Sequence, residues 1–230
     1  MLYLLTNDDG IDAPGIRALE LFARQLGDVI VVAPDGPRSG FSHRATVEGS
    51  MGLKQRDAEH YACAGTPVDC VRVAIAHLGI KPDWVLSGIN RGANLGVDLY
   101  MSGTAGAARE AAIQGIPAFA FSHYHRTQSS IDWEQAAESC HQVFQQFCQR
   151  DLPPTAFWNV NLPDPQDLKE ASHRTMEVPP DPSSLKLEYI AHAEAVEYKS
   201  HYHHRPRGKD TDVQHCLEGA TTVSCVKLFS

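Results

Sequence analysis

The sequence predicts an α/β fold in which helices cover both faces of a mostly parallel sheet. Apolar stretches of strand length alternate with helix-period patterns along most of the chain, and several of these stretches end in polar loops. The length of 230 residues, with 43% hydrophobic and 21% charged residues, suits one substantial soluble domain with a small appendage.

The first predicted strand is the apolar run 2–5, which leads directly into a pair of adjacent acids. Pro14 is expected in the first turn of the helix that follows, because apolar residues then repeat at helical spacing. Residues 29–33 form a second predicted strand, which ends in the polar loop 34–40.

Thr66 is expected to cap a further helix, with Pro67 at its first position and Asp69 at its third. The remaining predicted elements continue the alternation. They are a strand at 84–87, a helix from about 103 to 115, a strand at 116–121, a helix at 132–150 and a strand at 157–162.

Beyond about residue 164 the periodicity weakens, and proline and histidine become common. We therefore predict a core of residues 1–163, which carries every candidate site loop, and an irregular C-terminal extension of residues 164–230. The extension is expected to make oligomer contacts and not to form an independent domain. Within it, residues 223–226 are typical of a strand.

Composition excludes several classes of partner. The net charge is −8, from 20 basic and 28 acidic residues, so duplex nucleic acid is not an expected partner. No apolar stretch reaches transmembrane length, and no membrane association is expected. Six cysteines without a C-x-x-C pair predict neither a zinc site nor a disulfide framework, which favours a cytoplasmic location.

Asp8 and Asp9 are the first candidate site residues. Adjacent carboxylates repel one another unless a proton or a cation lies between them. A hard divalent ion such as Mg²⁺ or Mn²⁺ prefers carboxylate and neutral oxygen ligands, so the pair predicts a metal site. A helix-capping acid beside a solvated one explains the pair alone equally well.

Two further loops offer neutral oxygens at predicted strand ends. The hydroxyl of Ser39 is suited to a metal or a phosphate oxygen, although Ser39 beside Gly40 also fits an ordinary turn. The glycine-rich loop 87–96 lets the backbone approach a ligand closely, and its Asn90 and Asn94 supply amide oxygens and donors. It matches neither a Walker loop nor a dinucleotide-binding fingerprint.

Ser102, Gly103 and Thr104 open the helix predicted from residue 103. Backbone N–H groups at a helix N-terminus, together with hydroxyls, form an anion site, although a plain helix cap has the same sequence. A metal site and an anion site at one edge of a sheet are suited to a phosphate ester, because the ion polarises a phosphoryl oxygen while the helix end holds the others.

The order of these motifs closely resembles the SurE family, the stationary-phase survival proteins that act as nucleotidases. The resemblance covers roughly residues 1–163. The segments that carry it are 7–10, 13–16, 33–34, 38–40, 65–71, 87–90, 102–104 and the residues Gly92 and Asn94.

The resemblance implies a Rossmann-like three-layer sandwich and a phosphomonoesterase that uses one divalent cation, Mg²⁺ or Mn²⁺. Its expected substrates are nucleoside 5′-monophosphates, and also 3′-monophosphates. By motif position the implied metal ligands are Asp8, Asp9, Ser39 and Asn90, with Asp8 and Asp9 catalytic; the implied phosphate contacts are Asn94, Ser102, Gly103 and Thr104.

Two chemistries stay open for the reaction. Water coordinated to the ion is the expected nucleophile, and attack by Asp8 to form an aspartyl phosphate is its rival. A non-catalytic nucleotide-binding or regulatory protein, and a Rossmann-type transferase, are the alternative functions. The sequence does not indicate which residues read the base or the sugar.

The resemblance also implies a homodimer. Relatives of this family continue into a C-terminal helix exchanged between subunits, whereas this sequence stops at Ser230, so we expect a weakened dimer. His201, His203 and His204 fit no standard zinc spacing and are expected in a solvated or oligomer-facing loop. His43 and Arg44 follow Ser39 closely in the sequence, and we assign neither of them a role in catalysis or binding.

Overall fold

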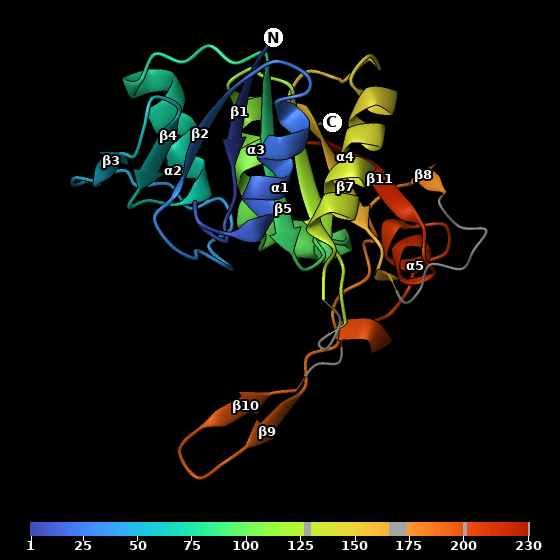
Figure 1. Cartoon of the computed structure of the whole chain (residues 1–230). Helices are drawn as coiled ribbons and strands as arrows, with labels where there is room; N and C mark the ends of the chain where they lie inside the picture. Colours follow the sequence, from blue (N-terminus) through green and yellow to red (C-terminus); the bar gives the residue numbers. More distant parts are fainter. Residues whose placement is uncertain (127–129, 166–173, 200–201, 230) are drawn as a thin grey trace.

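A mostly parallel sheet runs through the described part of the chain in the order β3-β4-β2-β1-β5-β6-β7-β11-β8. This computed structural model describes residues 1–126, 130–165, 174–199 and 202–229 (Figure 1). The strands of the sheet are β1 (Leu2–Thr6), β2 (Asp28–Pro34), β3 (Leu53–Gln55), β4 (His60–Cys63), β5 (Trp84–Arg91), β6 (Ala118–His123), β7 (Ala156–Leu162), β8 (Thr175–Glu177) and β11 (Thr221–Lys227).

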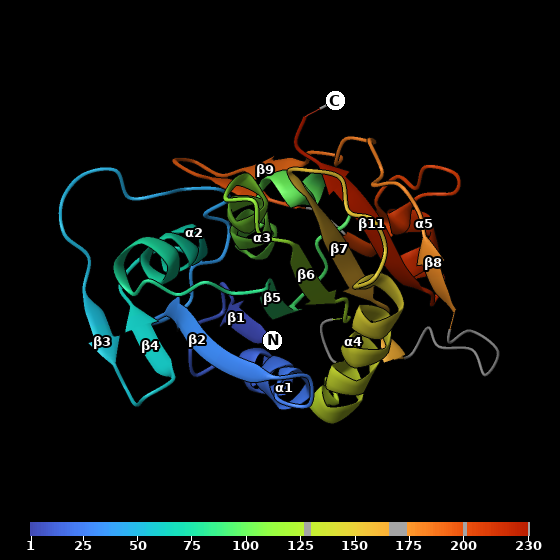
Figure 2. The ribbon, with the colours of Figure 1, turned by 90° about the horizontal axis from the view of Figure 1, so that it is seen from above.

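Helices cover both faces of the sheet, which confirms the predicted α/β fold. Figure 2 shows α1 and α4 on one face and α2 and α3 on the other. Neighbouring residues of β1 serve both layers, because Leu5 joins the core against α1 and α4 while Leu4 joins the core against α2 and α3. The helices are α1 (Pro14–Ala23), α2 (Pro67–Arg72), α3 (Gly103–Ile113), α4 (Trp133–Phe147) and α5 (Asp212–Leu217).

The helix starts follow the capping residues that the sequence predicts. Pro14 is the first residue of α1. Thr66 and Asp69 form a reciprocal capping box at α2. The C-terminal end of α2 is less regular: the helix finishes at Arg72 and continues as a π-helix over Val73–His77, where Ile75 and the following Leu78 are only half-buried.

β5 is longer than the predicted strand 84–87, because it continues to Arg91 with a register irregularity between Ser87 and Asn90. The backbone of Gly88 passes very close to β6. A Cβ at Gly88 would lie 2.4 Å from the carbonyl oxygen of Phe121, so glycine is required there. The extra length carries β5 past the end of β1, while Asn90 and Arg91 still pair with Ser122 and His123 of β6.

The C-terminal region contributes regular structure to the sheet. β11 contains the strand-like segment 223–226 and lies between β7 and β8, antiparallel to β7 from Thr222 opposite Asn161 to Lys227 opposite Ala156. A separate hairpin of β9 (Tyr189–Ala191) and β10 (Val196–Tyr198) projects away from the body (Figure 1). The division into 1–163 and 164–230 stays a prediction.

No helix in the described ranges has the length and apolar character needed to cross a membrane.

Candidate active site

The carboxyl ends of β1 and β5 bring the two acids beside the asparagine loop. The strands pair in parallel with Thr6 opposite Ser87, so the segments that follow them emerge at the same edge of the sheet. The backbone N–H of Arg91 donates a hydrogen bond to Asp9 Oδ2 at 3.1 Å, which joins the two segments directly.

Asp8 is buried, with 5% of its surface exposed, and it faces the start of α3. Its Oδ1 accepts a hydrogen bond from Thr104 Oγ1 at 2.6 Å. Burial raises the pKa of Asp8 to about 6; the Thr104 hydrogen bond opposes this shift, and the charge of Asp9 adds to it. The predicted acid and the predicted helix N-terminus are therefore in contact.

Gly103 permits this contact. A Cβ at Gly103 would lie 2.9 Å from Asp8 Cβ and 3.1 Å from Asp8 Oδ2, which is closer than a side chain can comfortably approach. The hydroxyl of Ser102 caps α3 by accepting from the Ala105 N–H at 3.0 Å. All three residues of the predicted anion site thus have a defined place at the first turn of α3.

Asp9 is half-buried, and burial raises its pKa, while the backbone hydrogen bond from Arg91 and the charge of Arg91 act in the opposite direction. Within the described residues, neither Asp8 nor Asp9 forms an ion pair with a lysine or arginine side chain. Two partly desolvated carboxylates that form no ion pair are suited to a bound cation.

Asn7 positions the acid pair, a role that the sequence analysis missed. Its Nδ2 donates to the carbonyl of Gly10 at 2.8 Å, and its Oδ1 accepts from the Gly10 N–H at 3.1 Å. Gly10 has a φ of +102°, and a Cβ there would lie 3.1 Å from backbone atoms of Gly36. An asparagine three residues before a glycine is the signal of such a turn.

Ser39 lies exposed in the loop after β2. Backbone hydrogen bonds tie this loop to both parts of the site: the Arg38 N–H donates to the Asp8 carbonyl at 2.7 Å, and the Ser42 N–H donates to the Met101 carbonyl at 3.2 Å. In the sequence, Ser39 therefore lies between a residue anchored to the acid pair and a residue anchored to Met101, just before α3. Its assignment as a ligand stays a prediction.

The two predicted asparagines differ in their surroundings. Asn90 is half-buried, and its Nδ2 donates to the Gly92 carbonyl at 2.8 Å, an arrangement that leaves Oδ1 as the free end of the amide. Asn94 is buried, and its Nδ2 donates to Ser122 Oγ at 2.7 Å. The backbone carbonyl of Asn94 also accepts from Asn161 Nδ2 at 3.1 Å. The side chain of Asn94 thus has a structural contact in addition to its predicted phosphate role.

The donor set suits a hard cation and not zinc. The described residues contain no group of three or more histidine, cysteine, aspartate or glutamate side chains arranged to hold a metal. Two carboxylates, an amide oxygen and a serine hydroxyl are the oxygen ligands that Mg²⁺ or Mn²⁺ accepts.

His203 and His43 contact residues other than the acid pair and the first turn of α3. His203 Nδ1 is 3.0 Å from the hydroxyl of Tyr124, and His201 falls outside the described residues. His43 lies in the loop after β2, and its Nε2 is 3.0 Å from Oε2 of Glu110 in α3.

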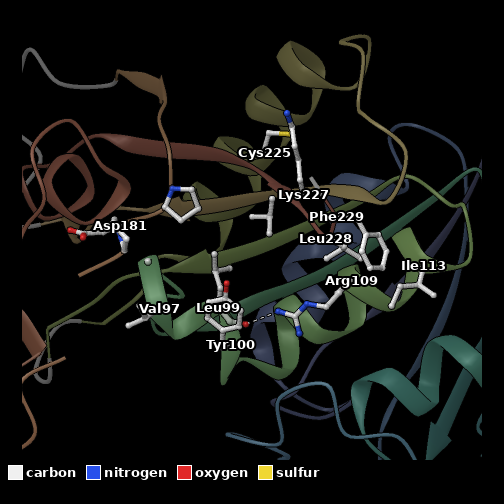
Figure 3. A pocket seen from close by; sticks show the side chains of 14 residues that line it. Val97, Leu99, Tyr100, Arg109, Ile113, Asp181, Cys225, Lys227, Leu228 and Phe229 are labelled. Carbon is white, nitrogen blue, oxygen red and sulfur yellow. Dashed lines mark hydrogen bonds between the residues drawn. The ribbon is translucent and has the colours of Figure 1, made fainter. Parts of the chain in front are cut away.

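A largely apolar cavity of about 650 Å³ lies apart from these residues, between α3 and the end of β11 (Figure 3). Tyr100, Ile113 and Phe229 contribute to its walls, and Arg109 donates from Nη2 to the Leu99 carbonyl at 2.8 Å beside it. None of the predicted metal or phosphate residues lines this cavity, so its size does not identify the active site.

Comparisons with known proteins show the family. A family model described as survival protein SurE matches residues 3–180. A protein of Synechocystis sp. is 39% identical over 228 residues, which cover 99% of this chain and 100% of that protein. The 5′-nucleotidase SurE of Christiangramia forsetii is 37% identical over 235 residues, which cover 96% of this chain and 89% of that protein.

A solved structure gives the same result for the fold. The crystal structure of the SurE protein from Aquifex aeolicus superimposes with a TM-score of 0.86 at 32% identity, covering 100% of this chain and 94% of that chain.

Proposed function

This chain belongs to the SurE family, and on that premise we propose that it is a divalent-cation-dependent 5′-nucleotidase, which hydrolyses nucleoside 5′-monophosphates to nucleoside and phosphate. The hydrogen bond from Thr104 to Asp8 carries the proposal, because it joins the acid pair to the helix N-terminus. A phosphate ester needs both features at one place. The relative from Christiangramia forsetii is named a 5′-nucleotidase. We propose that nucleoside 3′-monophosphates are also substrates.

We propose that Asp8, Asp9, Ser39 and Asn90 hold the cation. When bound, a divalent cation polarises a phosphoryl oxygen and lowers the pKa of a coordinated water. Asp8 enters this role with its Oδ1 fixed by Thr104, so its second oxygen is the one available to a ligand. Asn7 and the turn at Gly10 hold both acids at the end of β1.

The first turn of α3 is the proposed phosphate cradle. Backbone N–H groups of a helix N-terminus donate to phosphoryl oxygens, and the helix dipole favours their negative charge. Ser102, Gly103 and Thr104 are all buried, which shields this charge from water. The proposed task of the cradle is therefore to orient the phosphoryl group.

Phosphate release from a panel of nucleoside 5′- and 3′-monophosphates, with Mg²⁺ or Mn²⁺ and again with EDTA, tests this proposal. We expect cation-dependent release that Asp9→Ala abolishes. Asp151→Ala removes an exposed acid after α4 and is the matched control. Near-normal turnover in Asp8→Asn would contradict both the water and the aspartyl-phosphate mechanisms. A folded, cation-binding protein that releases no phosphate would instead support a non-catalytic nucleotide-binding protein.

A further inference from the structure

Two arginines flank the acid pair, one on each side. The backbone N–H of Arg38 donates to the Asp8 carbonyl at 2.7 Å, and the backbone N–H of Arg91 donates to Asp9 Oδ2 at 3.1 Å. Both backbones are therefore in direct contact with the acid pair. Their guanidinium groups have different partners.

The charge of Arg38 is already engaged. Its Nη2 lies 2.7 Å from Asp35 Oδ1, and its Nη1 donates to the Pro37 carbonyl at 3.0 Å. The guanidinium of Arg91 forms no ion pair with an acid among the described residues, although its charge acts on Asp9. Its Nε instead donates to Nε2 of His125 at 3.2 Å, a residue just beyond the end of the neighbouring strand β6.

The ring of His125 is oriented by a second hydrogen bond. Its Nδ1 lies 3.1 Å from the carbonyl oxygen of Arg126, and since a carbonyl only accepts, Nδ1 carries the proton. Nε2 is then the free acceptor that receives Arg91 Nε. A neutral acceptor fixes the direction of a guanidinium without neutralising its charge, and it leaves both Nη groups available.

We propose that Arg91 is a substrate-binding residue whose Nη groups contact the phosphoryl oxygens of the monoester, and that His125 is its positioning residue. The inference rests on the proposed function. A guanidinium binds phosphate through two parallel hydrogen bonds, which a single ammonium cannot reproduce. Holding the side chain in advance lowers the entropy lost on binding. In a chain of net charge −8, such a local cation also favours approach of an anion.

Arg91→Gln tests the first half of the inference. We expect the KM for a nucleoside monophosphate to rise about 10- to 100-fold, with a smaller change in kcat, because a charge-assisted contact to the substrate is lost. Inorganic phosphate, titrated by calorimetry and as a competitive inhibitor, should bind more weakly by a similar factor. Arg91→Lys should fall between wild type and Arg91→Gln. Arg24→Gln is the control, since Arg24 pairs with Glu20 and Glu59 beyond the end of α1, away from the site.

His125 variants test the positioning role. His125→Gln keeps an acceptor and should retain most of the phosphate affinity, whereas His125→Phe removes it and should raise KM about 3- to 10-fold. Because both residues act on one contact, the double variant Arg91→Gln/His125→Phe should be no worse than Arg91→Gln alone. Additive effects in the double variant would refute the positioning role.

The outcomes separate this inference from the proposed function. If the wild type hydrolyses nucleotides and Arg91→Gln leaves both KM and phosphate affinity unchanged, the inference is wrong and the function stands. If the wild type hydrolyses no monophosphate but binds phosphate more tightly than Arg91→Gln does, the function is wrong and the anion contact stands. Thermal melting of each variant confirms that the comparison is made on folded protein.

Discussion

Gly103 shows how a single missing methyl group positions this site. The start of α3 approaches Asp8 so closely that Gly103→Ala would force the helix and the acid apart. We expect an activity loss of about 10- to 100-fold, because small displacements of reacting groups carry losses of that size. Steady-state assays measure the loss. Gly52→Ala, where the added Cβ would lie 3.4 Å from Ala64 Cβ and does not contact Asp8, should stay near wild type.

Burial raises the pKa of Asp8, and the hydrogen bond from Thr104 limits that rise. The hydroxyl hydrogen bond stabilises the carboxylate and lowers its pKa, against a burial effect that raises the pKa to about 6. Thr104→Val should therefore raise the pKa of Asp8 further. A ¹³C-carboxyl NMR titration of the metal-free protein measures this shift. Thr222→Val removes a buried hydroxyl that has no hydrogen-bond partner in the described structure, and it should leave the titration of Asp8 unchanged.

For single residues, the sequence predicts which side chains belong to the site better than it predicts which of them touch one another. Asp8 and Thr104 are 96 positions apart, and their hydrogen bond follows from chain topology that no local pattern contains. The motif order nevertheless predicts that both belong to one site. The role of Asn7 and the proposed role of Arg91 were missed because each depends on the direction of a side chain, which spacing does not specify.

Among the elements, α3 is held to α2 by one buried acid. Glu110 accepts from Arg72 Nε at 2.8 Å and from Gln114 Nε2 at 2.9 Å, and His43 lies 3.0 Å away. Burial tends to raise the pKa of Glu110, but these hydrogen bonds outweigh it and lower the pKa to about 2. The carboxylate therefore stabilises the fold at neutral pH.

Glu110→Gln should lower the free energy of unfolding by about 1–3 kcal/mol at pH 7, a range that allows for the partly exposed Arg72. The pKa is lowered in the folded state, so this contribution is present above pH 4.5. It is lost as the pH falls toward about 2, and the gap between wild type and variant should close over that range. Urea unfolding at several pH values measures it. The exposed pair of Arg150 and Glu177 provides the control, because Glu177→Gln should cost less than about 1 kcal/mol.

Helix starts were predictable because capping is local. Thr66 and Asp69 satisfy each other's backbone groups within one turn, and a pattern of four residues contains that information. The end of β5 was not predictable in the same way. Its continuation past Ser87 depends on how closely Gly88 lies to Phe121 on the neighbouring strand.

For the whole molecule, β11 determines whether the predicted core of residues 1–163 can fold without the C-terminal extension. A chain truncated after Pro163 would leave one edge of β7 unpaired, with the buried residues Val160 and Phe157 losing their neighbours on β11. We expect this truncated chain to aggregate or to unfold at markedly lower urea concentration than the whole chain. A soluble, cooperatively folding fragment 1–163 would instead show that the extension is dispensable.

The predicted homodimer is also a property of the whole molecule, and light scattering of the purified chain tests it directly. A monomer at micromolar concentration would contradict the prediction. The family resemblance, in contrast, is confirmed: the match spans residues 3–180, and fold similarity to the Aquifex aeolicus protein covers all of the chain.

The position of β11 has a consequence for synthesis on the ribosome. β7 and β8 both pair with β11, which is the last strand of the sheet to be translated. One edge of β7 therefore stays unpaired while about sixty further residues are added to the nascent chain. During that interval the nascent chain exposes a strand able to pair with another copy. Slower translation of the segment between β7 and β11 should therefore lower the yield of soluble protein, and a chaperone that shields the open edge should restore it.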